Sequence, residues 1–377
     1  MKVEGALLRT IGERAGFHVE EVQLDPPHPG EVRVKLKAAG LCHSDFHFDA
    51  GDGLLEFSPL LAGHEGAGIV EEVGDGVTSL AVGDRVICTF MPSCGKCPSC
   101  IKGLGNLCDR GAGLMQGKAL DGTVRIHDAH GADVGPMTYL GTFAPQVVCP
   151  VESLVKIEGP DDIPWPVAAV LGCAVPTGWG TAVNIAGVEV GDTVVVIGTG
   201  GVGMNAVQGA RMAGASRIIA VDTAEFKRES APKFGATHTA ASVEEAFGLV
   251  QELTRGAMAD RVILTVGVID GSIIDPALNL VAKGGMLAIG GVSSMLQHQA
   301  EFSLFGFVMM QKQIRGGLYG GCNTQLVIPQ LVEAYRAGAL NLDDLVTTTY
   351  SLDQLNDGWR DMEEGRNIRG VVVYDDI

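Results

Sequence analysis

Residues 191–222 read GDTVVVIGTGGVGMNAVQGARMAGASRIIAVD, and this stretch predicts the architecture of the central part of the chain. A run of mostly β-branched residues, Thr193–Ile197, indicates a buried strand. It leads into a glycine-rich turn at 198–203, a helical run that ends near Gly214, and a second apolar strand that ends on Asp222. Strand, glycine turn, helix, strand and acid follow one another as a dinucleotide-binding unit requires.

The glycines of this turn have distinct physical roles. Gly198 permits the tight turn, Gly200 lets backbone N–H groups approach a pyrophosphate, and Gly203 lets the helix pack closely on the strand. The N-terminus of the helix attracts the phosphates through its free N–H groups and its dipole. The residues predicted to bind them are Gly198, Gly200, Gly201, Val202 and Gly203. A lone glycine triplet could be only a turn, but the flanking elements favour a dinucleotide site. Asp222 would bind the ribose hydroxyls and repel a 2′-phosphate, so NAD is predicted over NADP.

Strands and helices alternate after Gly191, which predicts a doubly wound parallel sheet. The candidate strands are 193–197, 217–221, 237–239, 261–266, 285–289 and 314–318. The candidate helices between them are 202–213, 224–234, 243–253 and 271–281. Short alternating runs up to about residue 40 predict a β-rich start, and the last ~60 residues do not continue the αβ pattern. We therefore expect the C-terminal segment to return to the first domain.

Composition narrows the function classes. The chain has 377 residues, enough for two domains, of which 46% are hydrophobic and 5% aromatic, as expected of an aliphatic α/β core. A formal net charge of −18 without a long basic run argues against nucleic acid and anionic membranes as partners. The N-terminus lacks a signal pattern and no run of ~18 apolar residues occurs, so a soluble, cytoplasmic protein is predicted. Its nine cysteines should then be thiols or metal ligands.

The most specific single motif is formed by Cys94, Cys97, Cys100 and Cys108, which are separated by two, two and seven residues. Four thiolates satisfy Zn²⁺ completely and leave no open position, so the motif predicts a structural zinc. An iron–sulfur cluster and free thiols are the alternatives. Ferredoxin runs, however, place three residues before the fourth cysteine and a proline after it, whereas Asp109 follows here.

A second candidate metal set consists of Cys42, His64 and Cys173, which lie far apart in the sequence. Taken singly, a buried cysteine is a common small hydrophobe, and a lone histidine is more often structural. Cys42 nevertheless lies in a polar, histidine-rich stretch, and His64 lies between glycines beside Glu65, an odd place for a core histidine. Two cysteines and one histidine leave a fourth position open, as in a catalytic zinc site. The two sets together predict two zinc ions per chain.

Four motifs make the chain resemble the zinc-dependent medium-chain alcohol dehydrogenases along nearly its full length. They are GHEGAGIV at 63–70, the cysteine cluster at 94–108, GCAVPTGWG at 172–180 and the glycines at 198–203. The resemblance implies a GroES-like, β-rich catalytic domain made from residues 1–175 and 319–377. It implies a Rossmann NAD-binding domain at 176–318, and we expect a homodimer or homotetramer.

The resemblance also assigns roles to single residues. Cys42, His64 and Cys173 become the ligands of the catalytic zinc. Asp45 orients the ligating histidine, and Glu65 is the acid beside the metal. Ser44 and His47 form a proton relay with a cofactor ribose hydroxyl between them. The residues expected at the cofactor are Thr177 near the nicotinamide, Asp222 and Lys227 at the adenosine ribose, Arg369 at the pyrophosphate, and Val292, Gly317 and Tyr319, whose backbone groups hold the carboxamide.

Two positions and three segments refine this assignment. His43 stands where several family members carry a phosphate-binding arginine, and a histidine is neutral half the time or more at pH 7. Phe90 is expected to line the alcohol pocket, with plain core packing as the alternative. The segments NLCDRGAGLMQG, LGTFA and VDTAEFKRE look closest to the bacterial nitrosoaniline (NDMA)-dependent alcohol dehydrogenases. These relatives are nicotinoproteins, which keep NAD bound through turnover.

The predicted reaction is the reversible oxidation of a primary or secondary alcohol to an aldehyde or ketone, with hydride transfer to the nicotinamide. A dehydrogenase of formaldehyde–thiol adducts, with the same zinc and NAD, is the alternative within the family. A cofactor-binding protein without turnover is the alternative outside enzymes. Cofactor-binding relatives without turnover have usually lost zinc ligands, and here all of the ligands are present.

Overall fold

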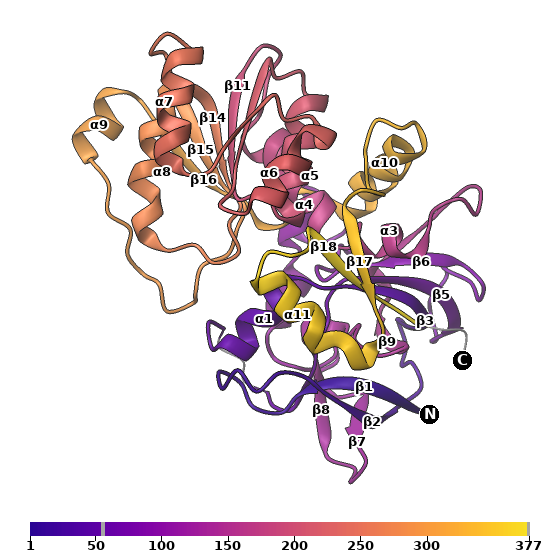
Figure 1. Ribbon diagram of the computed structural model, residues 1–377. Coiled ribbons are helices and arrows are strands. Elements are labelled where there is room, and N and C mark those ends of the chain that lie inside the picture. Colours follow the sequence, from indigo (N-terminus) through magenta and orange to yellow (C-terminus); the bar gives the residue numbers. More distant parts are fainter. Residues whose placement is uncertain (54–56, 375–377) are drawn as a thin grey trace. The chain divides into compact units, whose positions relative to one another are not determined.

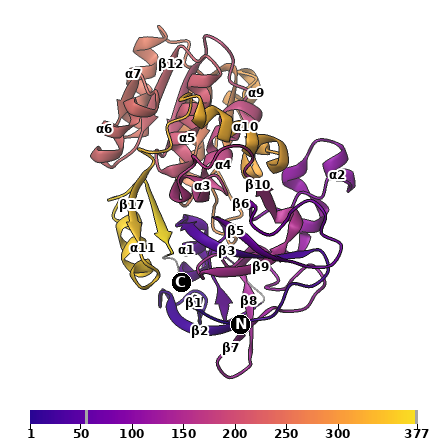
Figure 2. The same cartoon turned by 90° about the vertical axis from the view of Figure 1, so that its right-hand side faces the viewer.

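The computed structural model describes residues 1–53 and 57–374, which divide into two compact units. The first unit contains Met1–Cys173, Asn323–Glu333 and the segment from Val346 onward, and the second contains Ala174–Cys322 and Ala334–Leu345. These limits differ by a few residues from the predicted division, and they add the segment 334–345 to the second unit. Figures 1 and 2 show the elements of both units from two directions. None of the helices within the described ranges is long and apolar enough to cross a membrane.

The second unit is built on a six-stranded sheet in the order β13-β12-β11-β14-β15-β16. The strands are β11 (Thr193–Ile197), β12 (Arg217–Val221), β13 (His238–Ala240), β14 (Ala259–Leu264), β15 (Val281–Ile289) and β16 (Gln313–Gly316). Every neighbouring pair is parallel. The order is that of a doubly wound dinucleotide-binding sheet, so the predicted fold class of this part is confirmed. All five residues of β11 are buried, as expected of a central strand covered on both faces.

Some helices of the second unit begin or end at residues that cap them. They are α4 (Ala174–Gly180), α5 (Gly201–Met212), α6 (Glu225–Phe234), α7 (Val243–Leu253), α8 (Ile274–Leu280) and α9 (Leu304–Met309). The side chain of Ser242 caps the start of α7 by accepting a hydrogen bond from the Glu245 amide. Gly235 ends α6 in the left-handed conformation that favours glycine. The helix α4 stops at Gly180, and a π-helical turn follows over Thr181–Ile185.

The first unit is β-rich, as predicted. Strands β1, β2, β7, β8 and β4 close a barrel in that order. A second sheet has the order β10-β6-β5-β3-β18-β17, and β9 pairs with β3. The strands are β1 (Lys2–Leu8), β2 (His18–Leu24), β3 (Glu31–Gly40), β4 (Leu60–Leu61), β5 (Gly66–Val73), β6 (Arg85–Cys88), β7 (Ile126–Asp128), β8 (Asp133–Pro136), β9 (Gln146–Pro150), β10 (Leu154–Lys156), β17 (Val346–Tyr350) and β18 (Arg369–Val373). Because β18 pairs with β3, the C-terminal segment lies in the first unit.

Within the described residues five α-helices accompany these strands, and the first two of them were not predicted. They are α1 (His43–Ala50), α2 (Pro98–Ile101), α3 (Trp165–Val170), α10 (Thr324–Arg336, which extends into the second unit) and α11 (Leu355–Glu363). The sequence of α1, HSDFHFDA, has no apolar stripe. Its one clear signal is Gly51, which ends the helix with φ 84°.

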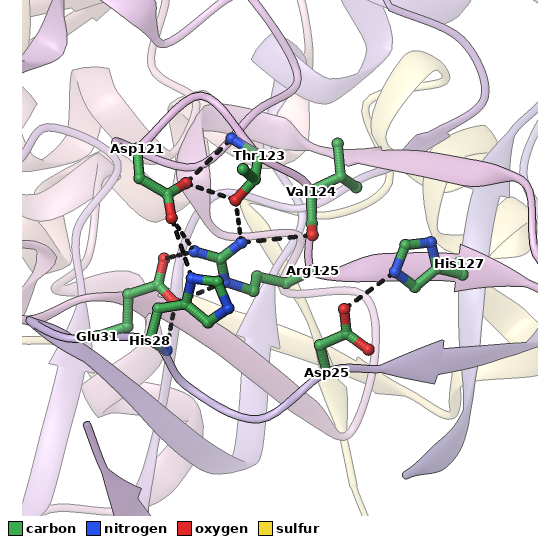
Figure 3. Close-up of polar contacts among 8 residues, drawn as sticks. All are labelled: Asp25, His28, Glu31, Asp121, Thr123, Val124, Arg125 and His127. Atoms are coloured by element: carbon green, nitrogen blue, oxygen red, sulfur yellow. Dashed lines mark hydrogen bonds and ion pairs between the residues drawn. The ribbon is translucent and has the colours of Figure 1, made fainter. Parts of the chain in front are cut away.

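A buried arginine connects the segment 111–135 to other parts of the first unit (Figure 3). The guanidinium of Arg125, whose side chain is 3% exposed, donates to both carboxylate oxygens of Glu31 at 2.8 and 3.0 Å. It also donates to Asp121 at 2.6 Å, and Nδ1 of His28 lies 3.1 Å from the same carboxylate oxygen. A buried charge needs such partners because it has lost its hydration. The network therefore connects the segment to the start of β3 and to the loop before it.

Candidate active site

The first unit brings Cys42, His64 and Cys173 together. Their ligand atoms lie within 4.8 Å of one another, and all three residues are buried. Cys42 precedes α1 and His64 lies two residues before β5, while Cys173 ends the segment after α3. Three segments distant in the sequence thus converge on one point. Two sulfurs and one imidazole at this spacing suit a tetrahedral metal ion with one position left open.

His64 is held in one orientation by Asp45 of α1. Oδ1 of Asp45 accepts hydrogen bonds from Nδ1 of His64 and from the amide of Gly63, both at 3.0 Å. Nδ1 therefore carries a proton in both charge states of the ring, and Nε2 is the nitrogen that can bind a metal once its own proton is lost. Nε2 is buried, and the side chain of Cys42 is its neighbour in the metal group. A carboxylate behind a histidine in this way is the usual support of a metal-binding imidazole.

The charges of the group favour the metal-binding form of its thiols. A hydrogen bond with Cys173, and then the charge of His64, hold the pKa of Cys42 well below its usual value against the effect of burial. Burial lowers the pKa of His64, but the charges of Asp45 and Cys42 outweigh burial and raise it to about 10. Without a metal the group therefore holds a thiolate beside a protonated ring. A divalent cation would take the place of that proton, so these residues fit zinc.

Glu65 lies next to the ligand His64 and is ion-paired with Arg369, the first residue of β18. Both side chains are buried. Gly40, at the end of β3, makes room for the carboxylate, because a Cβ there would lie 2.7 Å from the carboxyl carbon of Glu65. The predicted contact of Arg369 with a pyrophosphate stays a prediction. In the first unit the described partner of its guanidinium is Glu65.

The predicted relay residues lie on one face of α1. Oγ of Ser44 is 3.7 Å from Sγ of Cys42. His47 follows three residues later, so its side chain lies on the same face of the helix. His47 is buried, and its Nδ1 is 3.3 Å from Oδ2 of Asp52. The ring of Phe90 packs edge-on against the His64 ring, with 5.8 Å between centroids, so it borders the metal group while it also contacts the core.

The four-cysteine cluster forms a second group in the first unit. The sulfurs of Cys94, Cys97, Cys100 and Cys108 all lie within 4.8 Å of one another. Sγ of Cys97 accepts hydrogen bonds from the amides of Asp109 and Cys100, each at 3.4 Å. These amides lower the pKa of Cys97 to about 6. Four sulfurs with amide support suit a closed, structural zinc site.

The glycine turn of the second unit has the shape that a dinucleotide site needs. Gly198 has φ +87°, and a Cβ on Gly203 would overlap the carbonyl oxygen of Gly198. A Cβ on Gly200 would meet no atom within 4 Å, so the backbone is open to a ligand there. The helix α5 begins at Gly201, with Val202 in its first turn. Its free N–H groups lie where phosphates bind in this fold.

The other residues predicted at the cofactor follow the carboxyl ends of the strands or lie nearby. Oδ2 of Asp222, just after β12, accepts a hydrogen bond from the Thr199 amide at 2.8 Å, so it also anchors the glycine turn. The remaining positions are Lys227 in α6, Val292 after β15, Gly317 after β16, the buried Tyr319, and Thr177 in α4. These six residues belong to the second unit, whereas His43, the first residue of α1, belongs to the first.

Three supporting residues were missed by sequence reasoning. Oγ1 of Thr265 donates to the carbonyl of Gly198 at 2.8 Å and so holds the glycine turn. Oγ1 of Thr142 donates to the carbonyl of Glu65 at 3.0 Å. Asp52 lies beside His47. Single threonines and acids carry no motif, so only the fold could identify them.

Comparison with known proteins now places this arrangement in a class. The model of the alcohol dehydrogenase GroES-like domain matches residues 28–159, and that of the zinc-binding dehydrogenases matches residues 201–336. The chain belongs to the zinc-dependent alcohol dehydrogenase family, and the predicted GroES-like and Rossmann fold class is confirmed. It is 48% identical to alcohol dehydrogenase B of Mycobacterium tuberculosis over 377 residues, which cover 100% of this chain and 99% of that one.

Two further relatives bear on the subgroup. The NDMA-dependent alcohol dehydrogenase of Amycolatopsis methanolica is 45% identical, with 99% of each chain covered. The S-(hydroxymethyl)glutathione dehydrogenase of Paracoccus denitrificans is 36% identical, covering 95% of this chain and 96% of the other. Among solved structures, an alcohol dehydrogenase zinc-binding domain protein from Burkholderia ambifaria matches with a TM-score of 0.92 and 31% identity, with both chains fully covered. The similarity thus favours the NDMA-dependent branch over the glutathione-adduct branch.

Proposed function

We propose that this protein is a zinc- and NAD-dependent alcohol dehydrogenase that oxidises primary or secondary alcohols and keeps its NAD bound through turnover. The observation that carries the proposal is the buried group of Cys42, His64 and Cys173, supported by Asp45. It offers three ligands and an open position for a small oxygen ligand such as an alcohol. The four cysteines at 94–108 would hold the second zinc, which gives two per chain.

The chain's own residues would bind, orient and deprotonate the substrate. Zinc, when bound, polarises the alcohol hydroxyl, and NAD, when bound, accepts the hydride. Asp45 fixes the ring of His64, while Phe90 borders the group and limits the space beside it. Ser44, beside Cys42, accepts the proton of the alcohol hydroxyl as it gives up its own to the relay, which ends at His47. The balance is one alcohol hydrogen leaving as a proton to solvent and the other leaving as hydride to the nicotinamide.

The second unit would bind NAD through Asp222, Lys227 and the amides of the glycine turn. The carboxylate of Asp222 disfavours a 2′-phosphate, which supports NAD over NADP. Retention of NAD requires slow release, and affinity differences lie mostly in the dissociation rate. The 45% identity to an NDMA-dependent alcohol dehydrogenase supports retention. His43 in place of an arginine lowers the expected affinity for the cofactor phosphates.

The test is a spectrum and a cofactor assay of freshly purified protein. Alcohol added without NAD should produce the absorbance of reduced nicotinamide, and turnover should then require NDMA or another dye acceptor. Denaturation should release NAD(H) and zinc in amounts close to one and two per chain. If the protein is purified free of cofactor and added NAD supports full multiple turnover, NAD retention is wrong and the enzyme is an ordinary NAD-dependent alcohol dehydrogenase. Oxidation of formaldehyde only in the presence of a thiol would instead support the adduct dehydrogenase.

We also propose that the protein is a cytoplasmic homo-oligomer. In the described chain β16 is the last strand of the parallel sheet, and its backbone edge is exposed. The preceding helix α9 exposes Leu304, Phe305, Val308 and Met309. An unpaired edge beside exposed apolar side chains is suited to pairing with a second copy. Sedimentation equilibrium should give the mass of a dimer or tetramer, and charged residues at positions 305 and 308 should lower the measured mass.

The cytoplasmic location is proposed because a reducing compartment suits the thiols of the two metal groups.

A further inference from the structure

We infer that Asp52 is a positioning residue for proton release, acting through His47. The inference rests on the proposed function, because it assigns a role within the same oxidation. The histidine at the end of the relay is not on the surface: its side chain is 7% exposed. A buried base needs a path for its proton, and Asp52, 28% exposed, is the group beside it.

The backbone at the end of α1 brings the two side chains together. Gly51 takes the left-handed conformation with φ 84°, and the amide of Asp52 donates to the carbonyl of His47 at 2.8 Å. This bond across five residues defines a Schellman motif, in which the side chains of the first and last residues meet, usually as a hydrophobic contact. Here the two positions carry an imidazole and a carboxylate instead.

The turn is fixed by close packing. A Cβ on Gly51 would lie 3.0 Å from Cα of Gly12, whose own amide donates to the carbonyl of Phe48 at 3.0 Å. A Cβ on Gly53 would lie 2.6 Å from the ring of Phe48. The backbone on both sides of Asp52 therefore has little freedom, and the contact with His47 is held by tertiary structure.

The contact selects the tautomer of His47. A carboxylate only accepts hydrogen bonds, so Nδ1 at 3.3 Å from Oδ2 of Asp52 carries the proton. Nε2 is then the basic nitrogen. It is buried and makes no hydrogen bond within residues 1–53 and 57–374. A buried polar nitrogen without a protein partner calls for a structural or functional explanation, and a place at the end of the proton relay supplies one.

The proton balance follows from this geometry. Nε2 receives the proton that alcohol oxidation releases, and the ring becomes an imidazolium whose charge faces the Asp52 carboxylate. The Nδ1 proton passes to that carboxylate and then to water. Before the next turnover Nδ1 regains a proton from water through Asp52, and Nε2 loses its proton to water in the substrate-free site. The starting tautomer is thereby restored, and one proton is released per turnover. Asp52 contacts neither substrate nor metal in this scheme, and it acts only through His47.

The experiment is a double-mutant cycle on the full-length, zinc-loaded enzyme, with alcohol oxidation followed in dye-coupled or NAD-coupled turnover. Asp52→Asn should lower kcat about tenfold and leave the KM for alcohol within about twofold, because a proton-transfer partner is lost but no substrate contact. His47→Gln should lower kcat at least as much. The double variant should match His47→Gln alone, because Asp52 has no other route of action. Asp52→Glu should recover most of the rate.

A matched control and a spectroscopic readout separate this role from a structural one. Asp49→Asn removes a charge from the same helix end, where Oδ1 of Asp49 accepts a bond from the Gly16 amide that an asparagine can also accept. We expect its kcat to be unchanged. Nitrogen-15 NMR of the histidine rings reports the tautomer, and the His47 signals are assigned as those that disappear in His47→Gln. The His47 ring should be the Nδ1–H tautomer in wild type and a mixture of both tautomers in Asp52→Ala. This readout needs no turnover.

The outcomes are distinguishable from a failure of the proposed function. If Asp52→Asn has the wild-type rate, or lowers kcat by the same factor in the His47→Gln background, the role of Asp52 is wrong. An Nε2–H tautomer in wild type would also overturn it. If wild-type enzyme oxidises no alcohol with either NAD or dye, the proposed function fails, while the NMR result still reports on the pair.

Discussion

Arg369 and Glu65 form an ion pair inside the first unit, and their side chains are only 5% and 0% exposed. The pair connects the first residue of β18 to the residue that follows the metal-group histidine His64. Removing two ions from water costs several kcal/mol per ion, so neither charge is tolerated there alone. The ion pair thereby couples β18 to the metal group.

The first prediction concerns this pair. Arg369→Met should lower the free energy of unfolding of the first unit by about 3–5 kcal/mol, because the buried Glu65 carboxylate loses the positive charge of its ion pair. The double variant Glu65→Leu with Arg369→Met should recover most of the loss. Urea unfolding of the zinc-loaded protein measures both. Arg366→Met is the control, since Arg366 is 53% exposed and pairs with Asp361 and Glu364 at the surface. An unchanged urea midpoint for Arg369→Met, together with weaker NAD binding, would favour the pyrophosphate role instead.

The second prediction concerns metal content. The two groups should give close to two zinc ions per chain by elemental analysis. Cys173→Ala should retain the zinc of the four-cysteine cluster and lose turnover. Cys97→Ala should lower the melting temperature, because a structural zinc contributes folding free energy. Active enzyme with one zinc per chain would contradict the two-site interpretation.

The third prediction concerns thiol reactivity after zinc removal. The amides of Asp109 and Cys100 lower the pKa of Cys97 to about 6, whereas burial raises the pKa of Cys88 to about 12. At pH 7 most of Cys97 is a thiolate, the reactive form, and Cys88 is a thiol. Chelator-treated protein should therefore be alkylated by iodoacetamide at Cys97 and not at Cys88, as read by peptide mass spectrometry. Equal labelling of the two cysteines would show that the zinc-free cluster does not keep its amide contacts.

The sequence was most informative where the signal is local. β11, β12 and α7 were predicted to the residue, because strand and helix periodicities and glycine turns are properties of neighbouring residues. The helix α1 was missed because its sequence lacks such a local signal. It is polar, and its residues Asp45 and His47 are buried only by tertiary contacts. The pairing of Arg369 with Glu65 could not be predicted from local pattern, since it depends on β18 joining β3.

The fourth prediction concerns cofactor choice, and the structure sharpens its design. Asp222 accepts hydrogen bonds from the amides of Thr199 and Ala224, so its removal also loosens the glycine turn. Asp222→Asn keeps an acceptor and removes the charge, whereas Asp222→Gly removes both. Both variants should narrow the preference for NAD over NADP, and only Asp222→Gly should also weaken NAD binding strongly. Equilibrium binding of the two cofactors measures this. Equal wild-type affinity for NAD and NADP would contradict the assignment of Asp222.

The last prediction concerns acid stability and the segment fastened by Arg125. Burial raises the pKa of Asp121, but hydrogen bonds from Thr123 and Arg125 outweigh it and hold that pKa well below the ordinary value of about 3.9. The pKa of Asp121 is therefore lower in the folded state than in the unfolded state. The ionised carboxylate contributes its full share to the free energy of unfolding above about pH 4, and this contribution is lost as the pH falls through the folded-state pKa.

The side chain of Asp121 is 43% exposed, so solvent screening limits this contribution to about 0.2–1 kcal/mol at neutral pH. Asp121→Asn should therefore lower stability slightly at pH 7 and show a shallower decline than wild type between pH 5 and pH 3, followed by urea midpoints. In wild type, the rate of amide hydrogen exchange of residues 111–135, relative to the rest of the first unit, should increase as the pH falls from 5 to 3. The control is Asp133→Asn, because Asp133 lies in the same segment and contacts His127 rather than Arg125. Parallel curves for wild type and Asp121→Asn would mean that the Asp121 carboxylate does not anchor this segment.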